Sequence, residues 1–184
     1  MNDHTFREAF HTDVIREYRR CKDGVEKALS QVSDDEFFRL LEGDHDGNSI
    51  AIIVKHMAGN MRSRWRDFLT TDGEKPDRHR DTEFELSESE DRTHLMAFWE
   101  ESWQTLFHAI EPLTPEELEA TITIRREPMS VIQALLRQLT HYSYHAGQIV
   151  LLARYYKGED WQSLSIPRGK SEEFFKNPEA YIKK

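Results

Sequence analysis

Apolar residues recur at steps of three and four along four long stretches of the chain. In one of them Trp99, Trp103 and Leu106 follow one another on a single stripe. Such steps match the 3.6-residue turn of a helix that buries one face. The pattern predicts helices at residues 5–29, 49–70, 88–111 and 130–157.

Each of these four predicted helices must cover its apolar stripe, and they can do so by packing together. The sequence therefore predicts an all-α protein, a four-helix bundle with short connecting helices. Residues 121–125 alternate as a strand does, so a minimal strand segment is the most β structure that we expect. Capping boxes place two helix starts, at Ser87 with Glu90 and at Ser130 with Gln133.

Composition narrows the class of protein. The 184 residues are 38% hydrophobic and 32% charged, which fits one domain over residues 1–184 with a buried core. The formal net charge of −9 argues against nucleic acid as a partner. Because no apolar run approaches the length of a membrane span, no membrane partner is expected and the cytoplasm is the expected location. The single cysteine, Cys21, excludes a disulfide framework and a cysteine-rich zinc site.

Residues 71–91 form the longest predicted connection, and connections of this length are often functional or mobile. We expect either a lid or a linker there. A cluster of arginines overlaps its start and alternates with acidic residues, so we interpret it as a solvated, ion-paired surface. Its members are Arg62, Arg64, Arg66, Arg78 and Arg80.

The fourth predicted helix carries two histidines, His141 and His145. Their spacing puts both imidazoles on one face, about 6 Å apart along the helix axis. Neutral imidazole is a ligand for zinc, nickel and iron. No Asp or Glu lies between Ser130 and Lys157, which argues against a carboxylate-bridged di-iron centre.

The second predicted helix carries His56, with Asn60, Ser63 and Asp67 on the same face. A polar line on an otherwise apolar helix must be hydrogen-bonded or must bind something. Two interpretations stay open on the residues alone. His56 is either the third ligand of a metal site or a core histidine bonded to a carbonyl.

With these residues in view, the chain resembles the DinB-like superfamily, also called YfiT-like. That superfamily includes metal-dependent hydrolases and the bacillithiol and mycothiol S-transferases. Its pattern is one histidine on the second helix and His-x-x-x-His followed by Gly-Gln on the fourth, which matches His56, His141, His145 and Gly147-Gln148. The chain looks closest to an uncharacterised bacterial branch with HMAGNMRSRWRDFLTTDGEKP (residues 56–76) and SIPRG (residues 165–169).

The resemblance implies an up-down-down-up four-helix bundle with one divalent metal ion, zinc or nickel, at one end. The ligands would be His56, His141 and His145.

Other polar residues near these histidines are candidates for supporting roles. We predict that Asn60 and Gln148 fix the imidazole tautomers and that Arg64 pairs with an anionic group of the substrate. Asp67 and Glu83 are candidates for a general base.

For function, the resemblance implies thiol S-transfer or hydrolysis of a small molecule, with a low-molecular-weight thiol as a possible partner. The alternative is a non-catalytic stress-response or binding module whose metal stabilises the bundle. A homodimer that uses the exposed flanks of the helices is a further expectation.

Overall fold

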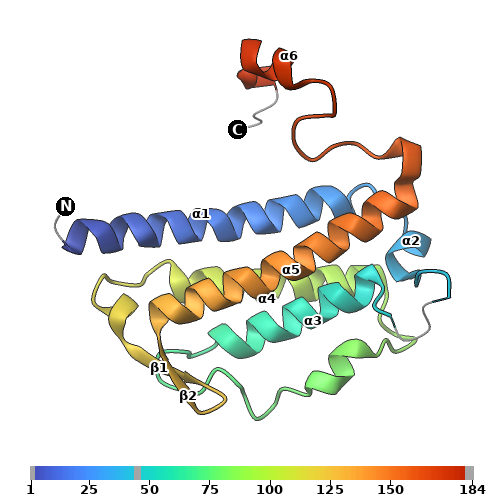
Figure 1. Ribbon diagram of the computed structural model, residues 1–184. Coiled ribbons are helices and arrows are strands. Elements are labelled where there is room, and N and C mark those ends of the chain that lie inside the picture. Colours follow the sequence, from blue (N-terminus) through green and yellow to red (C-terminus); the bar gives the residue numbers. More distant parts are fainter. Residues whose placement is uncertain (1–2, 44–46, 181–184) are drawn as a thin grey trace.

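Four long helices dominate the structure, which is a computed structural model that describes residues 3–43 and 47–180 (Figure 1). The predicted mainly helical class is confirmed. None of the described helices is long and apolar enough to cross a membrane. The long helices are α1 (Asp3–Leu29), α3 (Ile50–Trp65), α4 (Arg92–Ile110) and α5 (Val131–Lys157).

Short elements connect and follow the long helices. The predicted strand is β1, and it pairs antiparallel with β2, a strand that the sequence did not predict. These short elements are α2 (Asp34–Phe38), η1 (Arg80–Phe84), η2 (Glu117–Glu119), β1 (Thr121–Ile124), β2 (Glu127–Ser130), η3 (Gly158–Asp160), α6 (Ser171–Lys176) and η4 (Pro178–Ala180).

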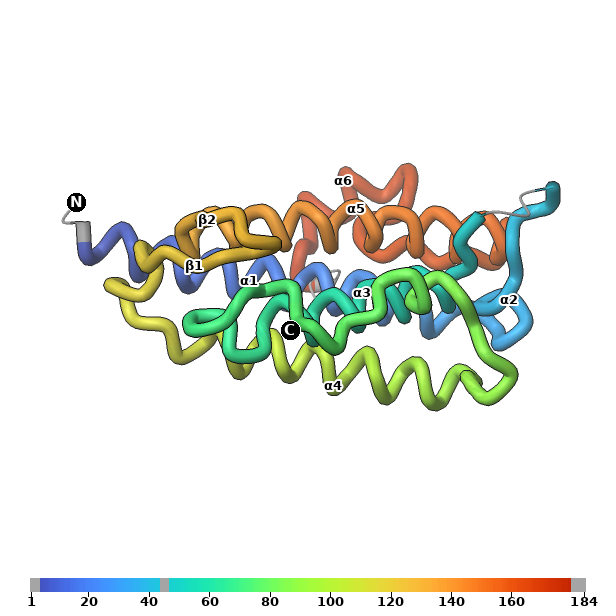
Figure 2. Tube along the Cα trace, turned by 90° about the horizontal axis from the view of Figure 1, so that it is seen from below, coloured from blue at the N-terminus to red at the C-terminus, as the bar shows by residue number. Residues whose placement is uncertain are grey.

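The long helices lie side by side, with α3 packed against α4 and α5, and α1 packed against α5. Helices α3 and α4 run in one direction, and α1 and α5 run in the other (Figures 1 and 2). These directions are compatible with the up-down-down-up bundle, which stays a prediction. The buried apolar side chains form one cluster, with the aromatic rings of Tyr18, Trp99, Trp103 and Tyr142 fully enclosed.

Two helix boundaries differ from the prediction. Helix α3 ends at Trp65 rather than at residue 70, because Asp67 adopts a left-handed φ of 48° and its carbonyl accepts the amides of Thr70 and Thr71. Phe68 is buried although it lies beyond the helix.

The second difference is at the start of α4. This helix begins at Arg92, with the Asp91 side chain accepting the His94 amide as its N-cap. The predicted start at residue 88 is wrong, because Ser87 and Glu90 bond each other in the turn before the helix. The other predicted cap is confirmed, since the Ser130 side chain accepts the amide of Gln133 at the start of α5.

The long connection from α3 to α4 runs back along α3 (Figure 2) and packs η1 against that helix. Lys75 and Glu83, both in this connection, are only 7% and 6% exposed. The connection therefore packs against the helices and is not a free linker. It contributes side chains to the face of α3 that carries His56.

The β-hairpin is tied to the same connection. Its two turn residues, Arg125 and Arg126, have φ values of 57° and 65°, as a type I′ turn requires, although arginine disfavours this conformation. The Asp72 carboxylate accepts the backbone amides of Arg125 and Arg126 at 2.8 and 2.7 Å and that of Glu74 at 2.7 Å. Asp72 therefore holds the turn in place and fixes where Arg125 lies.

We predict that Asp72→Ala lowers the free energy of unfolding by about 1 to 2 kcal/mol, because three amides lose a charged acceptor that is partly exposed to water. The control is Asp77→Ala, which removes an exposed carboxylate of the same connection that pairs with Arg66. Urea unfolding of the two variants measures both effects. Equal destabilisation by the two substitutions would contradict the role given to Asp72.

Candidate metal centre

Three imidazoles from two neighbouring helices converge on one point. Helix α3 contributes His56, and α5 contributes His141 and His145. One ring nitrogen of each lies within 4.8 Å of the other two. The Nε2 atoms of His141 and His145 are 3.1 Å apart. The predicted convergence of these three histidines is confirmed.

His56 is oriented by a carboxylate from the long connection. Its Nδ1 lies 2.8 Å from Oε2 of Glu83, and both residues are buried. Because a carboxylate only accepts, Nδ1 carries the proton, and the lone pair of this imidazole is on Nε2. That nitrogen is the one free to bind a metal.

Glu83 is held in turn by Arg78. The guanidinium donates from Nε to Oε1 at 2.8 Å and from Nη2 to Oε2 at 2.9 Å, a two-bond pairing. Burial by itself raises the pKa of Glu83, but the hydrogen bonds from Arg78 and His56 outweigh it and lower that pKa. The Glu83 side chain therefore stays ionised as the acceptor for His56.

Gly59 makes room for this carboxylate on α3. A Cβ at this position would lie 2.5 Å from Oε1 of Glu83, closer than a carbon and an oxygen can approach. Gly59 is one turn after His56, so it opens the helix surface beside the imidazole that Glu83 contacts. The glycine is thus part of the support for His56.

On α5, Gln148 plays the corresponding part for His145. Its Oε1 lies 2.8 Å from Nδ1 of His145. When the amide oxygen accepts, Nδ1 of His145 carries the proton and the Nε2 lone pair is free. The contact predicted for Gln148 is present.

The third imidazole, His141, is held in its neutral form. Burial, followed by the neighbouring His145 and His56, lowers the pKa of His141 to about 3. Burial also lowers the pKa of His145. Neutral imidazole is the form that binds metal, so both rings are ready to coordinate at neutral pH.

The two nitrogen donors on α5 are spaced as ligands of one divalent ion would be. With metal–nitrogen bonds of about 2.0–2.1 Å, two adjacent ligands lie roughly 3.0–3.4 Å apart, and the observed 3.1 Å falls in that range. Two imidazole lone pairs at this distance repel each other unless a proton or a cation lies between them.

Other predicted site residues lie near the histidines but have different partners. Oδ1 of Asn60 accepts the hydroxyl of Tyr142 at 3.1 Å, and among the described residues Asn60 forms no hydrogen bond with an imidazole. Arg64 is 6% exposed and donates from Nη1 to the carbonyl of Gly73 and to Glu74.

The two candidate bases are placed very differently. Asp67 is exposed beyond the end of α3, eleven residues after His56, which corresponds to roughly 16 Å of helix rise. Glu83 is beside His56, but both of its oxygens already accept hydrogen bonds. The geometry therefore favours a positioning role for Glu83 over proton abstraction.

The three-histidine site opens into a pocket of about 200 Å³. Interpreting the arginine cluster as solvated surface was wrong for Arg64 and Arg78, whose side chains are only 6% and 3% exposed. It holds for Arg66, which forms an exposed ion pair with Asp77. The pocket is lined by His56, Asn60, Arg64, Arg78, Arg80, Arg125, Arg137, Gln138 and His141.

Comparison with known proteins gave one match. The sequence matches the family described as "Protein of unknown function (DUF1572)" over residues 5–170. No curated protein and no solved structure matched the chain. Membership of the DinB-like superfamily stays a prediction from the resemblance.

We predict that Gly59→Ala lowers the affinity for zinc by about 10- to 100-fold, because the new methyl group displaces Glu83 and releases His56. Competition with a chromophoric chelator measures this affinity.

The matched control is Gly147→Ala, on the other histidine-bearing helix, where a Cβ meets nothing within 4 Å. This control should keep the zinc affinity and raise the stability by about 0.5–1 kcal/mol through helix propensity. Equal zinc affinities in the two variants would show that Glu83 does not support the site.

Proposed function

Since the chain belongs to the family described as "Protein of unknown function (DUF1572)", we propose its function from the site itself. The protein is a divalent-metal-dependent enzyme that acts on a small molecule, as a thiol S-transferase or as a hydrolase. The observation that carries this proposal is the convergence of one nitrogen each from His56, His141 and His145 within 4.8 Å.

A divalent ion on these three imidazoles, zinc or nickel by ligand type, would supply a Lewis acid that lowers the pKa of a water or a thiol. Three protein ligands leave coordination positions open, which is typical of catalytic sites and not of structural ones. This difference favours an enzyme over a module with a structural metal.

Residues of the chain prepare the donors. Glu83 accepts a hydrogen bond from Nδ1–H of His56, and Gln148 accepts one from Nδ1–H of His145. The Nε2 lone pair of each imidazole is therefore left free to face the shared point. In the transfer reaction, sulfur of the small thiol forms a bond to carbon of the second substrate. The bond from that carbon to its leaving group X breaks, and the thiol proton leaves with X as HX. In hydrolysis, water takes the place of the thiol.

The chain itself offers no suitable thiol for this reaction. Cys21 is half-buried on α1, and burial raises its pKa to about 11, so it is protonated at neutral pH. It lines a groove between α1 and α5 and not the pocket beside the histidines. The thiol of a transfer reaction would therefore be a separate small molecule.

The rival proposal is a non-catalytic stress-response or binding module in which the same histidines hold a stabilising metal. Both proposals allow a homodimer. An exposed apolar surface on α5 is available for one, with side chains 48% to 74% exposed at Leu136, Tyr144, Leu151 and Tyr155.

The metal site is tested by the metal content of protein purified without a histidine tag. We expect about one divalent ion per chain in the wild type and none in the double variant His141→Ala, His145→Ala. The control is His94→Ala, His108→Ala, which removes two exposed histidines of α4 and should keep the metal. Equal content in both double variants would refute the site.

Turnover separates the enzyme from the module. Zinc- and nickel-loaded protein is assayed with a small thiol and electrophiles such as epoxides or chlorodinitrobenzene, and with a panel of hydrolysable esters and amides. The enzyme predicts turnover that chelation abolishes and added metal restores. Full metal content with no turnover across the panel would favour the module.

A further inference from the structure

The pocket beside the three histidines is strongly basic, although the chain as a whole carries a net charge of −9. Five arginines line it, and no acidic residue is among its lining residues. They come from four separate parts of the chain: α3 contributes Arg64, the long connection contributes Arg78 and Arg80, the hairpin turn contributes Arg125, and α5 contributes Arg137.

Nearby carboxylates neutralise only part of this charge. Glu74 is shared among three guanidinium groups, with its oxygens 2.8 Å from Arg64, 2.9 Å from Arg125 and 3.4 Å from Arg78. Glu83 pairs with Arg78 and also accepts a hydrogen bond from His56. Two buried or half-buried carboxylates therefore face three arginines.

The remaining two arginines have weak partners. Arg137 reaches Glu127 at 3.3 Å, and Arg80 reaches Asp81 at 3.9 Å, and each of these pairs is more than two-fifths exposed on both sides. Exposed ion pairs of this kind contribute little and exchange easily. Their guanidinium groups can therefore turn to a ligand at low cost.

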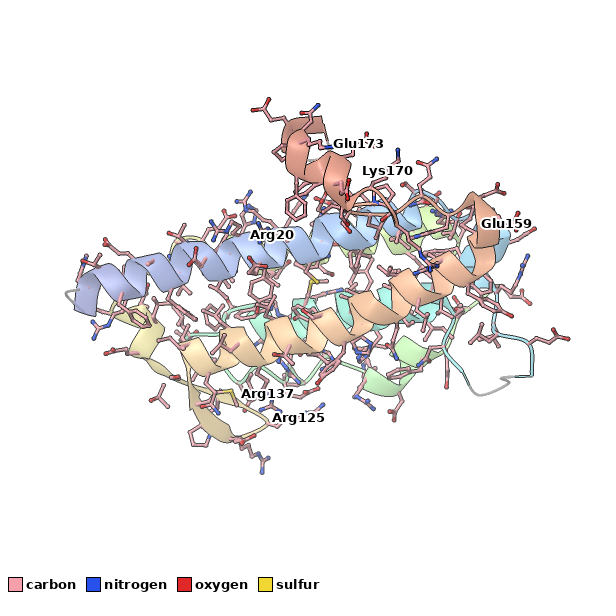
Figure 3. All side chains as sticks on the ribbon, turned by 45° about the horizontal axis from the view of Figure 1, so that its top comes forward. Arg20, Arg125, Arg137, Glu159, Lys170 and Glu173 are labelled. Atoms are coloured by element: carbon pink, nitrogen blue, oxygen red, sulfur yellow. The ribbon has the colours of Figure 1, made fainter. Side chains whose placement is uncertain are left out.

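A hydrogen-bond donor at the pocket also lacks a protein partner. Among the described residues, Nε of Arg64 is buried without any hydrogen bond. The side chain of Arg125 bonds Glu74 through Nε, which leaves its terminal nitrogens available. Arg125 and Arg137 line the same pocket, near the hairpin and the start of α5 (Figure 3). Buried donors without partners are costly, and a ligand would satisfy them.

We propose that this pocket binds a compact oxyanion, a phosphate or carboxylate group carried by the substrate. Arginine suits such a group because its planar guanidinium pairs with two oxygens at once. The volume of about 200 Å³ has room for such a group and for a neighbouring part of the molecule that carries it. His56 and His141 line the same pocket, so the rest of the substrate would lie against the three-histidine site.

The assignment of this anion as part of a substrate rests on the proposed function, but the binding of the anion does not. Chelator-treated protein is therefore titrated first with inorganic phosphate and then, separately, with acetate. Binding is followed by NMR through the backbone amides and the Nε–H group of Arg64. Comparison of the two affinities shows whether the pocket prefers a phosphate or a carboxylate group.

The test variant is Arg125→Gln, Arg137→Gln, and the control is Arg16→Gln, Arg20→Gln. Both remove two positive charges, but the control arginines form exposed ion pairs on α1. Arg20 lies on α1, on the side away from the hairpin (Figure 3). We expect saturable binding to the wild type, weakened about tenfold or more by the test variant and less than about twofold by the control.

The proposal would be overturned by the absence of saturable binding of either anion, or by the same affinity in the test and control variants. Binding that appears only after zinc is added and ignores the arginine substitutions would also overturn it. If the protein binds the anion but cannot bind a metal, the result would support the proposed anion site and contradict the proposed enzymatic function.

Discussion

The hydrogen-bonded chain from Arg78 through Glu83 to His56 is the interaction on which the site depends. It joins the long connection to α3 and determines which nitrogen of His56 is free. Burying a carboxylate is costly unless it is paired, and here a two-bond arginine pair together with the imidazole offsets that cost. These hydrogen bonds also require a glycine at position 59, because any side chain there would take the place of the Glu83 carboxylate. Loss of Glu83 would remove both the acceptor of His56 and the two-bond partner of Arg78, so this carboxylate links the other two residues.

The same connection gives the site its electrostatic character. By packing along α3 it brings Arg78 and Arg80 beside Arg64, while Asp72 fixes the hairpin turn that carries Arg125. The outcome is a small basic pocket in an acidic protein. Burial lowers the pKa values of His141 and His145, and five arginines line the adjoining pocket. The site therefore has the charge that the proposed anionic substrate requires.

Much of this structure could be predicted from the sequence. The prediction succeeded for features that depend on one periodic pattern or on one short residue spacing. The apolar stripes predicted the four long helices, and His-x-x-x-His placed His141 and His145 on one face of α5. The prediction that His56 joins these two histidines rested on the family resemblance as well. From the residues alone, His56 could equally be a core histidine bonded to a carbonyl. The early end of α3 was missed because the left-handed conformation of Asp67 has no periodic signature. From the sequence alone Glu83 is only a candidate base, and no sequence pattern points to Arg125 or Arg137, because packing between distant segments brings them to the pocket.

The central claim is that three imidazole nitrogens bind one divalent ion, and X-ray absorption spectroscopy of the zinc-loaded protein tests it most directly. The account predicts about three imidazole nitrogens at roughly 2.0–2.1 Å with the multiple scattering of histidine rings. It also predicts that this histidine signal falls when His56 is replaced by alanine. A first shell made only of oxygen, or a spectrum unchanged by that replacement, would contradict it.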